Sequence, residues 1–171
     1  MDLRQHIRQI PDFPKRGILF YDISTLLQRV DAFEAALDRM AEVVAAYRPG
    51  HLVGIESRGF IFGAPLALKL GLGFGMVRKQ GKLPGSVVTH AYHLEYGSDS
   101  IEMSADLIAP ASRVVIVDDL IATGGTAAAT GELLRKVGAE PVAAVFLIEL
   151  TGLKGRKRLD VPVESLIAYE G

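Results

Sequence analysis

Cysteine is absent from this chain of 171 residues. Its absence excludes disulfides, thiolate metal sites and a cysteine nucleophile. Long apolar runs are lacking too: no stretch reaches the roughly 18 consecutive apolar residues that a membrane-spanning helix needs. The first ten residues, MDLRQHIRQI, contain no apolar signal-peptide core. We therefore expect a cytoplasmic protein that does not bind membranes.

An excess of basic residues is also missing. Lys and Arg number 19 against 20 Asp and Glu, which leaves a formal charge of -1. Proteins that bind nucleic acids usually carry a basic excess, so we expect no nucleic-acid partner. Any affinity for phosphate must come from a local cluster of residues.

Short apolar runs alternate with helical patterns along the chain. Nearly uninterrupted runs rich in β-branched residues are typical of strands buried on both faces of a parallel sheet. The expected strands lie at residues 51–55, 74–77, 114–117 and 142–147, and the expected helices at residues 31–47, 60–70 and 126–137. This alternation predicts the α/β class: a single domain over residues 1–171, with a central, mostly parallel, doubly wound sheet flanked by helices.

The first of these helices has a clear apolar face. Its apolar side chains recur at intervals of three or four residues: Phe33, Leu37, Met40, Val44 and Tyr47. Asp31, with Glu34 three residues later, resembles a capping box and predicts that the helix begins there.

Residues 80–101 interrupt the alternation. The segment QGKLPGSVVTHAYHLEYGSDSI is dotted with glycine and mixes charged with aromatic side chains. Connections of this length in a compact domain are usually functional lids or disordered segments. We expect a flexible active-site loop here, either a lid or an active-site hairpin, with a structurally neutral excursion as the alternative.

The segment VVIVDDLIATGGTA, residues 114–127, carries the strongest chemical signal. Asp118 and Asp119 lie at the expected carboxyl end of a strand, where open α/β sheets bind ligands. A turn precedes the next helix and consists of Ala122, Thr123, Gly124, Gly125 and Thr126. Its glycines let backbone N–H groups approach a ligand, its hydroxyls add donors, and the positive end of the helix points at the same place. This combination predicts a phosphate-binding turn.

Other interpretations of this segment are weaker. It is not a P-loop, because no lysine follows the glycines. Paired acids after a strand also suit a receiver domain, which would leave the glycine–threonine turn unexplained. A plain strand-to-helix turn with solvated acids remains as a third alternative.

Two further segments favour anion binding. Ser57, Arg58 and Gly59 lie between an expected strand and an expected helix and form a second candidate anion turn. Arg78, Lys79 and Lys82 follow another strand, and arginine forks and lysine charges both hold phosphates. A solvated basic surface is the alternative for these three residues.

Five segments in order resemble the adenine phosphoribosyltransferases, a family of type I phosphoribosyltransferases. They are PDFPKRGILFYDISTLL (11–27), GIESRGFIFGAPLA (54–67), VRKQGKLPG (77–85), LEYGSDSIE (94–102) and VVIVDDLIATGGTA (114–127). The resemblance spans almost the whole chain. It implies the type I phosphoribosyltransferase fold, a homodimer, and Mg²⁺-dependent transfer of phosphoribose from phosphoribosyl pyrophosphate (PRPP) to adenine.

The resemblance also implies roles for the residues above. Asp118 and Asp119 would hold the ribose hydroxyls, and residues 122–126 the 5′-phosphate. Ser57, Arg58, Arg78, Lys79 and Lys82 would bind pyrophosphate, with a cis peptide bond just before Arg58. Mg²⁺ would lie near the two aspartates and be held mainly by the substrate's own diphosphate.

Base recognition is expected in an amino-terminal hood, residues 1–30. By resemblance, Phe20 would stack on the purine, while the backbone of Leu19 and Tyr21 would read its edge. Leu120 and Ile121 would cover the other face of the base. Tyr21 replaces an arginine of some relatives, which leaves backbone recognition possible but removes any role of that side chain. Taken alone, Phe20 is better explained as a core residue, and only the resemblance makes stacking an equal alternative.

By resemblance, Glu95 in the expected loop is the candidate acid–base residue, and Arg58 is the other expected catalytic residue. Taken alone, Glu95 is better explained as a solvated charge. A carboxylate there would stabilise the sugar cation and help the incoming nitrogen lose its proton. Two alternative functions stay open: the same transfer to a 6-oxopurine base, and a non-catalytic PRPP sensor.

Overall fold

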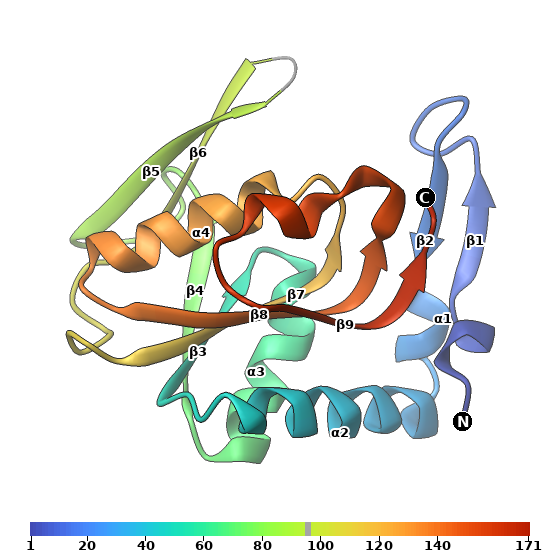
Figure 1. Ribbon diagram of the computed structural model, residues 1–171, viewed down its shortest axis with the longest axis horizontal. Coiled ribbons are helices and arrows are strands. Elements are labelled where there is room, and N and C mark those ends of the chain that lie inside the picture. Colours follow the sequence, from blue (N-terminus) through green and yellow to red (C-terminus); the bar gives the residue numbers. More distant parts are fainter. Residues whose placement is uncertain (95–96) are drawn as a thin grey trace.

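A seven-stranded sheet forms the centre of the molecule. The computed structural model describes residues 1–94 and 97–171. The strands of the sheet are β3 (His51–Ile55), β4 (Gly73–Lys79), β5 (Val87–Leu94), β6 (Gly97–Ser104), β7 (Arg113–Ile121), β8 (Glu140–Leu150) and β9 (Val163–Tyr169). Their order is β5-β6-β4-β3-β7-β8-β9, as Figure 1 shows. Strands β4, β3, β7, β8 and β9 pair in parallel, so the predicted α/β fold with a mostly parallel sheet is confirmed.

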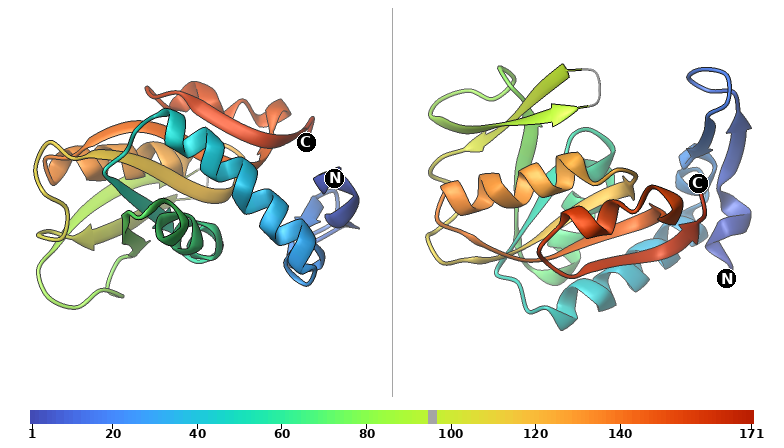
Figure 2. Two further views of the ribbon diagram at one scale, coloured as in Figure 1. Left: turned by 90° about the horizontal axis from the view of Figure 1, so that it is seen from below. Right: turned by 45° about the horizontal axis from the view of Figure 1, so that its top comes forward.

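Helices cover both faces of the sheet. α2 (Val30–Ala46) and α3 (Arg58–Leu70) lie on one face, and α4 (Gly125–Lys136) lies on the other (Figures 1 and 2). Each face has its own cluster of buried apolar side chains, with Val115 and Val117 in one and Val114 and Ile116 in the other. This alternation along β7 explains the continuous apolar run in the sequence, because both faces of the strand are covered. Within the described residues, no helix is long and apolar enough to cross a membrane.

The predicted capping box of α2 is wrong. The helix begins one residue earlier, at Val30, and its N-cap is Arg29, which makes no side-chain capping bond. The carboxylate of Asp31 instead accepts hydrogen bonds from the Arg29 guanidinium. A strong charge–charge partner was available to Asp31, and sequence spacing alone does not reveal it.

The apolar face of α2 is also centred differently from the prediction. Met40 and Val44 are fully buried as expected, but Phe33, Leu37 and Tyr47 lie at its margin. The buried residues of the helix include three with small side chains: Ala32, Ala36 and Ala41. Small side chains let the helix approach its neighbours closely, which a search for large apolar residues does not detect.

Two antiparallel hairpins project from the molecule (Figures 1 and 2). One consists of β1 (Arg8–Pro11) and β2 (Leu19–Asp22), between the 3₁₀ helix Leu3–His6 and the short helix α1 (Ser24–Leu27). The other consists of β5 and β6. Tyr21 ties the first hairpin to the sheet by stacking on Tyr169 of β9, with 4.1 Å between ring centroids. The second hairpin occupies most of the expected loop 80–101, which is therefore largely strand; that it closes over a ligand stays a prediction.

Candidate active site at the carboxyl edge of the sheet

Asp118 and Asp119 lie near the carboxyl end of β7, just before its last two residues. Asp119 has only 5% of its surface exposed, and its Oδ2 accepts a hydrogen bond of 2.7 Å from Arg58 Nε. Burial, reinforced by the neighbouring Asp119 carboxylate, raises the pKa of Asp118. A Cβ at Gly59 would lie 2.9 Å from Asp118 Oδ1, so only glycine lets α3 begin this close to the acids.

The glycine–threonine turn lies beside these acids and opens α4. Gly124 is the N-cap and adopts the left-handed conformation, with φ of 81°. Together with Asp118, Arg78 and Lys79, the turn lines a cavity of about 270 Å³. The structure therefore brings the predicted phosphate turn, one predicted ribose acid and two predicted pyrophosphate-binding cations around one hollow.

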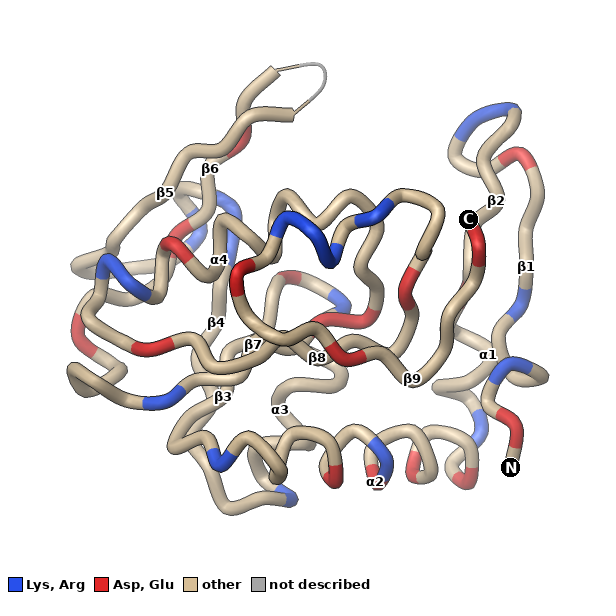
Figure 3. Tube along the Cα trace, viewed as in Figure 1, with Lys and Arg blue, Asp and Glu red and all other residues tan. Residues whose placement is uncertain are grey.

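A segment that was not predicted from the sequence packs against the backbone of this turn. It comprises the 3₁₀ helices Thr151–Leu153 and Gly155–Arg158, which follow β8. A Cβ at Gly124 would lie 2.3 Å from Gly155 O, so the two backbones touch. Arg156 anchors the segment through an ion pair with Glu149, which is 2% exposed. Figure 3 shows Lys and Arg gathered in this segment, beside the start of α4. The run KGRKR was a visible signal for it.

The second predicted anion turn joins β3 to α3. Ser57 is the N-cap of α3, and the Glu56–Ser57 peptide bond is cis, at the position that the family resemblance implied. Ser57 and Arg58 line a cavity of about 310 Å³ together with Asp118, Asp119 and Leu120. The turn and the paired acids therefore face the same space.

The expected base-binding residues are only partly brought together. Phe20 contacts Phe13 edge-on, with 5.1 Å between ring centroids, and the Arg58 guanidinium carbon lies 5.8 Å from the Phe20 centroid. These three residues line a cavity of about 470 Å³, which Tyr21 also borders. Leu19 is 38% exposed.

Leu120 and Ile121 lie elsewhere. Leu120 borders the cavity of the paired acids and also the hollow of the glycine–threonine turn. Ile121 is 1% exposed, packs in the cluster under α4, and borders the hollow of the phosphate turn. Both side chains therefore border the hollow of the glycine–threonine turn, and neither lines the cavity beside Phe20.

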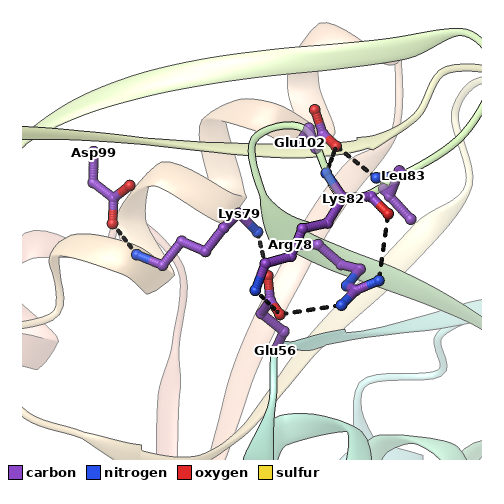
Figure 4. Close-up of polar contacts among 7 residues, drawn as sticks. All are labelled: Glu56, Arg78, Lys79, Lys82, Leu83, Asp99 and Glu102. Carbon is purple, nitrogen blue, oxygen red and sulfur yellow. Dashed lines mark hydrogen bonds and ion pairs between the residues drawn. The ribbon is translucent and has the colours of Figure 1, made fainter.

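Two carboxylates, the partly buried Glu56 and the buried Glu102, organise the three basic residues, as Figure 4 shows. Glu56 accepts hydrogen bonds from Lys79 N at 2.5 Å and from Lys82 Nζ at 3.0 Å, and Arg78 Nη2 lies 3.4 Å away. Glu102 accepts from the backbone N–H groups of Lys82 at 3.0 Å and Leu83 at 2.8 Å. Lys79 also forms an ion pair with Asp99. The basic residues are therefore held in place, and are not a freely solvated surface.

The ionisation of both glutamates fits this role. Burial works against the charged form of Glu56, but the N–H of Lys79 and the ammonium of Lys82 outweigh it and lower the pKa. The Leu83 N–H is the main cause that lowers the pKa of Glu102, against burial. Neither residue could be predicted from the sequence, because isolated acids carry no pattern. Glu95, the candidate acid–base residue, lies outside the described residues.

The acids alone do not make a metal cage. Within residues 1–94 and 97–171, no group of three or more His, Asp or Glu side chains could hold a metal ion. Asp119 is already engaged by Arg58. The donor set fits a hard cation that takes most of its ligands from a bound substrate and water.

Comparisons with known proteins show the family and the fold. The profile of the family "Phosphoribosyl transferase domain" matches residues 21–167. The adenine phosphoribosyltransferase of Rhodospirillum centenum is 61% identical over 170 residues, covering 99% of both chains. The crystal structure of the Thermoanaerobacter pseudethanolicus enzyme superposes with a TM-score of 0.95 at 46% identity, covering 98% of both chains.

A third relative was crystallised with ligands. The Saccharomyces cerevisiae enzyme, in complex with adenine and an imino-altritol bisphosphate, superposes with a TM-score of 0.89 at 44% identity and covers 94% of both chains. High identity over nearly the full length and the same fold lead to one conclusion: this chain belongs to the adenine phosphoribosyltransferase family.

Proposed function

We propose that this chain transfers the phosphoribosyl group of PRPP to adenine in purine salvage, giving AMP and pyrophosphate. The observation that carries the proposal is one hollow bordered by Asp118, by the glycine–threonine turn and by the cations Arg78 and Lys79. Such a hollow suits a sugar that carries phosphate at two ends. The yeast relative was crystallised with adenine, which supports adenine as the base.

The sugar phosphate is held by β7 and the turn after it. Asp118 and Asp119 bind the ribose hydroxyls, and residues 122–126 bind the 5′-phosphate. Free N–H groups at the start of α4 and the helix dipole both favour an anion at that position. Mg²⁺ fits next to the two aspartates, where it would neutralise charge on the diphosphate.

The pyrophosphate is held by the Ser57–Arg58 turn and by the basic cluster. Arg78, Lys79 and Lys82 already lie in fixed positions, so little ordering is needed when the anion binds. Arg58 is shared between Asp119 and the ring of Phe20. From there its guanidinium reaches the space between the base pocket and the acids, where the bond to pyrophosphate breaks.

Adenine binds in the cavity beside Phe20, with its edge read by the backbone of Leu19 and Tyr21. Departure of pyrophosphate leaves a cation-like sugar, and a purine ring nitrogen attacks the anomeric carbon and loses its proton. Glu95 is the proposed group that takes this proton and stabilises the cation. Closure of the loop 80–101 would exclude water that otherwise hydrolyses the sugar cation.

The base-competition assay tests this function. Purified protein, Mg²⁺ and PRPP are mixed in parallel with adenine, guanine, hypoxanthine and xanthine, and nucleotide and pyrophosphate are measured. We expect AMP from adenine alone, and no product from the Asp118→Ala/Asp119→Ala variant. Reaction with a 6-oxopurine would disprove the adenine pocket. Binding of PRPP with no reaction of any base would show a sensor.

We further propose that the chain forms one domain over residues 1–171, with a base-binding hood at residues 1–30, and that it acts as a cytoplasmic homodimer. These proposals rest on the family resemblance. Sedimentation velocity at several protein concentrations tests the dimer, and a species with the mass of one chain throughout would contradict it.

A further inference from the structure

Tyr92 lies behind the phosphate turn and reaches it through its hydroxyl. Tyr92 belongs to β5, is 8% exposed, and packs in the apolar cluster with Ala127 and Leu133 of α4. Its Oη lies 3.1 Å from Oγ1 of Thr126, the second residue of α4. Thr126 lines the hollow of the phosphate turn, whereas Tyr92 borders a separate cavity that is lined by residues of α4 such as Ala128 and Glu132.

Hydrogen-bond chemistry assigns a direction to this contact. A threonine hydroxyl has one hydrogen to donate and two lone pairs to accept with. In the ligand-free protein, either Tyr92 or Thr126 can be the donor. A phosphate oxygen only accepts, so a bound phosphate requires the Thr126 hydrogen for itself. The remaining arrangement is a chain in which Tyr92 donates to Thr126 and Thr126 donates to the phosphate.

We propose that Tyr92 is a positioning residue that orients the Thr126 hydroxyl toward the 5′-phosphate of the ligand. This inference rests on the proposed function, because it takes residues 122–126 as the phosphate site. The tyrosine occupies one lone pair of Oγ1 and turns the hydrogen toward the hollow. Neighbouring hydrogen bonds in such a chain strengthen one another in a low-dielectric environment.

The surroundings of Tyr92 keep it in place for this role. Its ring is enclosed between the sheet and α4, so the hydroxyl cannot swing away from Thr126 without breaking apolar contacts. A second tie holds β5 against the same helix, because Lys136 Nζ donates to Thr89 O at 2.9 Å. The contact therefore connects the β5–β6 hairpin to the phosphate turn.

Tyr92→Phe removes only the hydroxyl and tests the proposal with little disturbance of packing. A neutral hydrogen bond of this kind corresponds to about a 3- to 10-fold change in affinity. We expect the KM for PRPP and the Kd for AMP to rise by about that factor, while the KM for adenine stays within about twofold. A merely structural role would move all three constants together, or none of them.

Two variants serve as controls. Tyr47→Phe deletes another tyrosine hydroxyl. Tyr47 is the C-cap of α2, and its hydroxyl donates to Glu164 Oε1 at 2.5 Å. We expect this variant to leave the KM for PRPP, the Kd for AMP and the KM for adenine unchanged. In a Thr126→Val background, Tyr92→Phe has no hydroxyl left to orient and should add less than about a twofold effect.

The outcomes separate this inference from the function beneath it. Equal weakening of PRPP and adenine binding, no weakening at all, or an undiminished effect in the Thr126→Val background would each overturn the role of Tyr92. If the wild-type protein binds neither PRPP nor AMP, the proposed function fails, and the role of Tyr92 fails with it.

Discussion

Arg58, the first residue of α3, donates from Nε to Oδ2 of Asp119 in β7 at 2.7 Å, and so joins the two candidate ligand-binding segments. The pair is asymmetric: half of the Arg58 side chain is exposed, against 7% of that of Asp119. The buried acid is therefore fixed, while the arginine has room to exchange partners. A bound pyrophosphate would compete with Asp119 for the same guanidinium.

Arg58→Ala should weaken substrate binding far more than it weakens the fold. A charge-assisted bond to an anion supports a rise of at least about tenfold in the KM for PRPP. The loss of stability should stay near 1 kcal/mol, because the arginine is half exposed and solvent screens the pair. Initial rates and urea unfolding measure the two effects. Arg29→Ala breaks the exposed pair with Asp31 and should change neither; a similar KM effect there would show that charge in general is responsible.

Asp118→Asn should stabilise the ligand-free protein while it impairs the reaction. Burial and the neighbouring Asp119 raise the pKa of Asp118 above that in the unfolded chain. The folded state therefore keeps a proton that the unfolded state releases, and stability falls as pH rises above about 4. Asparagine does not ionise, so its advantage should be absent near pH 4 and grow toward pH 7.

Urea unfolding with a chelator present, at several pH values, measures this difference. Activity should fall at least about tenfold, since a ribose contact is lost. The quantity to compare is the unfolding free energy of Asp118→Asn minus that of the wild type. If this difference is smaller at pH 7 than at pH 4, the raised pKa of Asp118 is contradicted.

The pair Arg8–Asp22 should make the amino-terminal hairpin acid-sensitive. Hydrogen bonds from Ser24, with the guanidinium of Arg8, lower the pKa of Asp22 from 3.8 to about 2. A lowered pKa contributes stability that is fully present above about pH 4 and is lost as pH falls toward 2. Asp22→Asn should therefore cost up to about 2 kcal/mol at pH 7 and progressively less at lower pH. Asp106→Asn, at an exposed acid, is the control; equal pH dependence of the two variants would disprove the assignment.

Gly124→Ala should disrupt the phosphate turn. The residue has φ of 81°, and a Cβ there would lie 2.3 Å from Gly155 O, a backbone atom that cannot move freely. We expect a loss of more than about 2 kcal/mol in unfolding free energy and a marked loss of activity.

Gly131→Ala is the matched control within the same helix. Its added Cβ would meet only Arg135 Nη1, at 3.7 Å, so the substitution should be neutral or stabilise by up to about 1 kcal/mol. Similar losses at both glycines would show that helix α4 tolerates no added methyl group, and would remove the special role of Gly124.

Local patterns in the sequence were enough to predict the layered fold and to locate the paired acids and the glycine–threonine turn. Buried strands such as β7 carry unbroken apolar runs, and the turn before α4 needs glycine and hydroxyl residues within five positions. Both are local patterns, because they depend on strand burial and on backbone conformation. A hairpin within residues 80–101 was among the expectations, but the bounds of its strands β5 and β6 were not predicted, and the edge strand β9 was missed. The half-exposed residues of these strands follow no unbroken apolar run.

The side chains that support those elements come together only through the packing of distant segments. Glu102 reaches the backbone of Lys82 and Leu83 because β6 pairs antiparallel to β4, and Gly155 touches Gly124 because the chain returns there after β8. Tyr92 and Thr126 meet across 34 positions of sequence. Such contacts depend on strand register and on how segments pack in space, which no local pattern encodes.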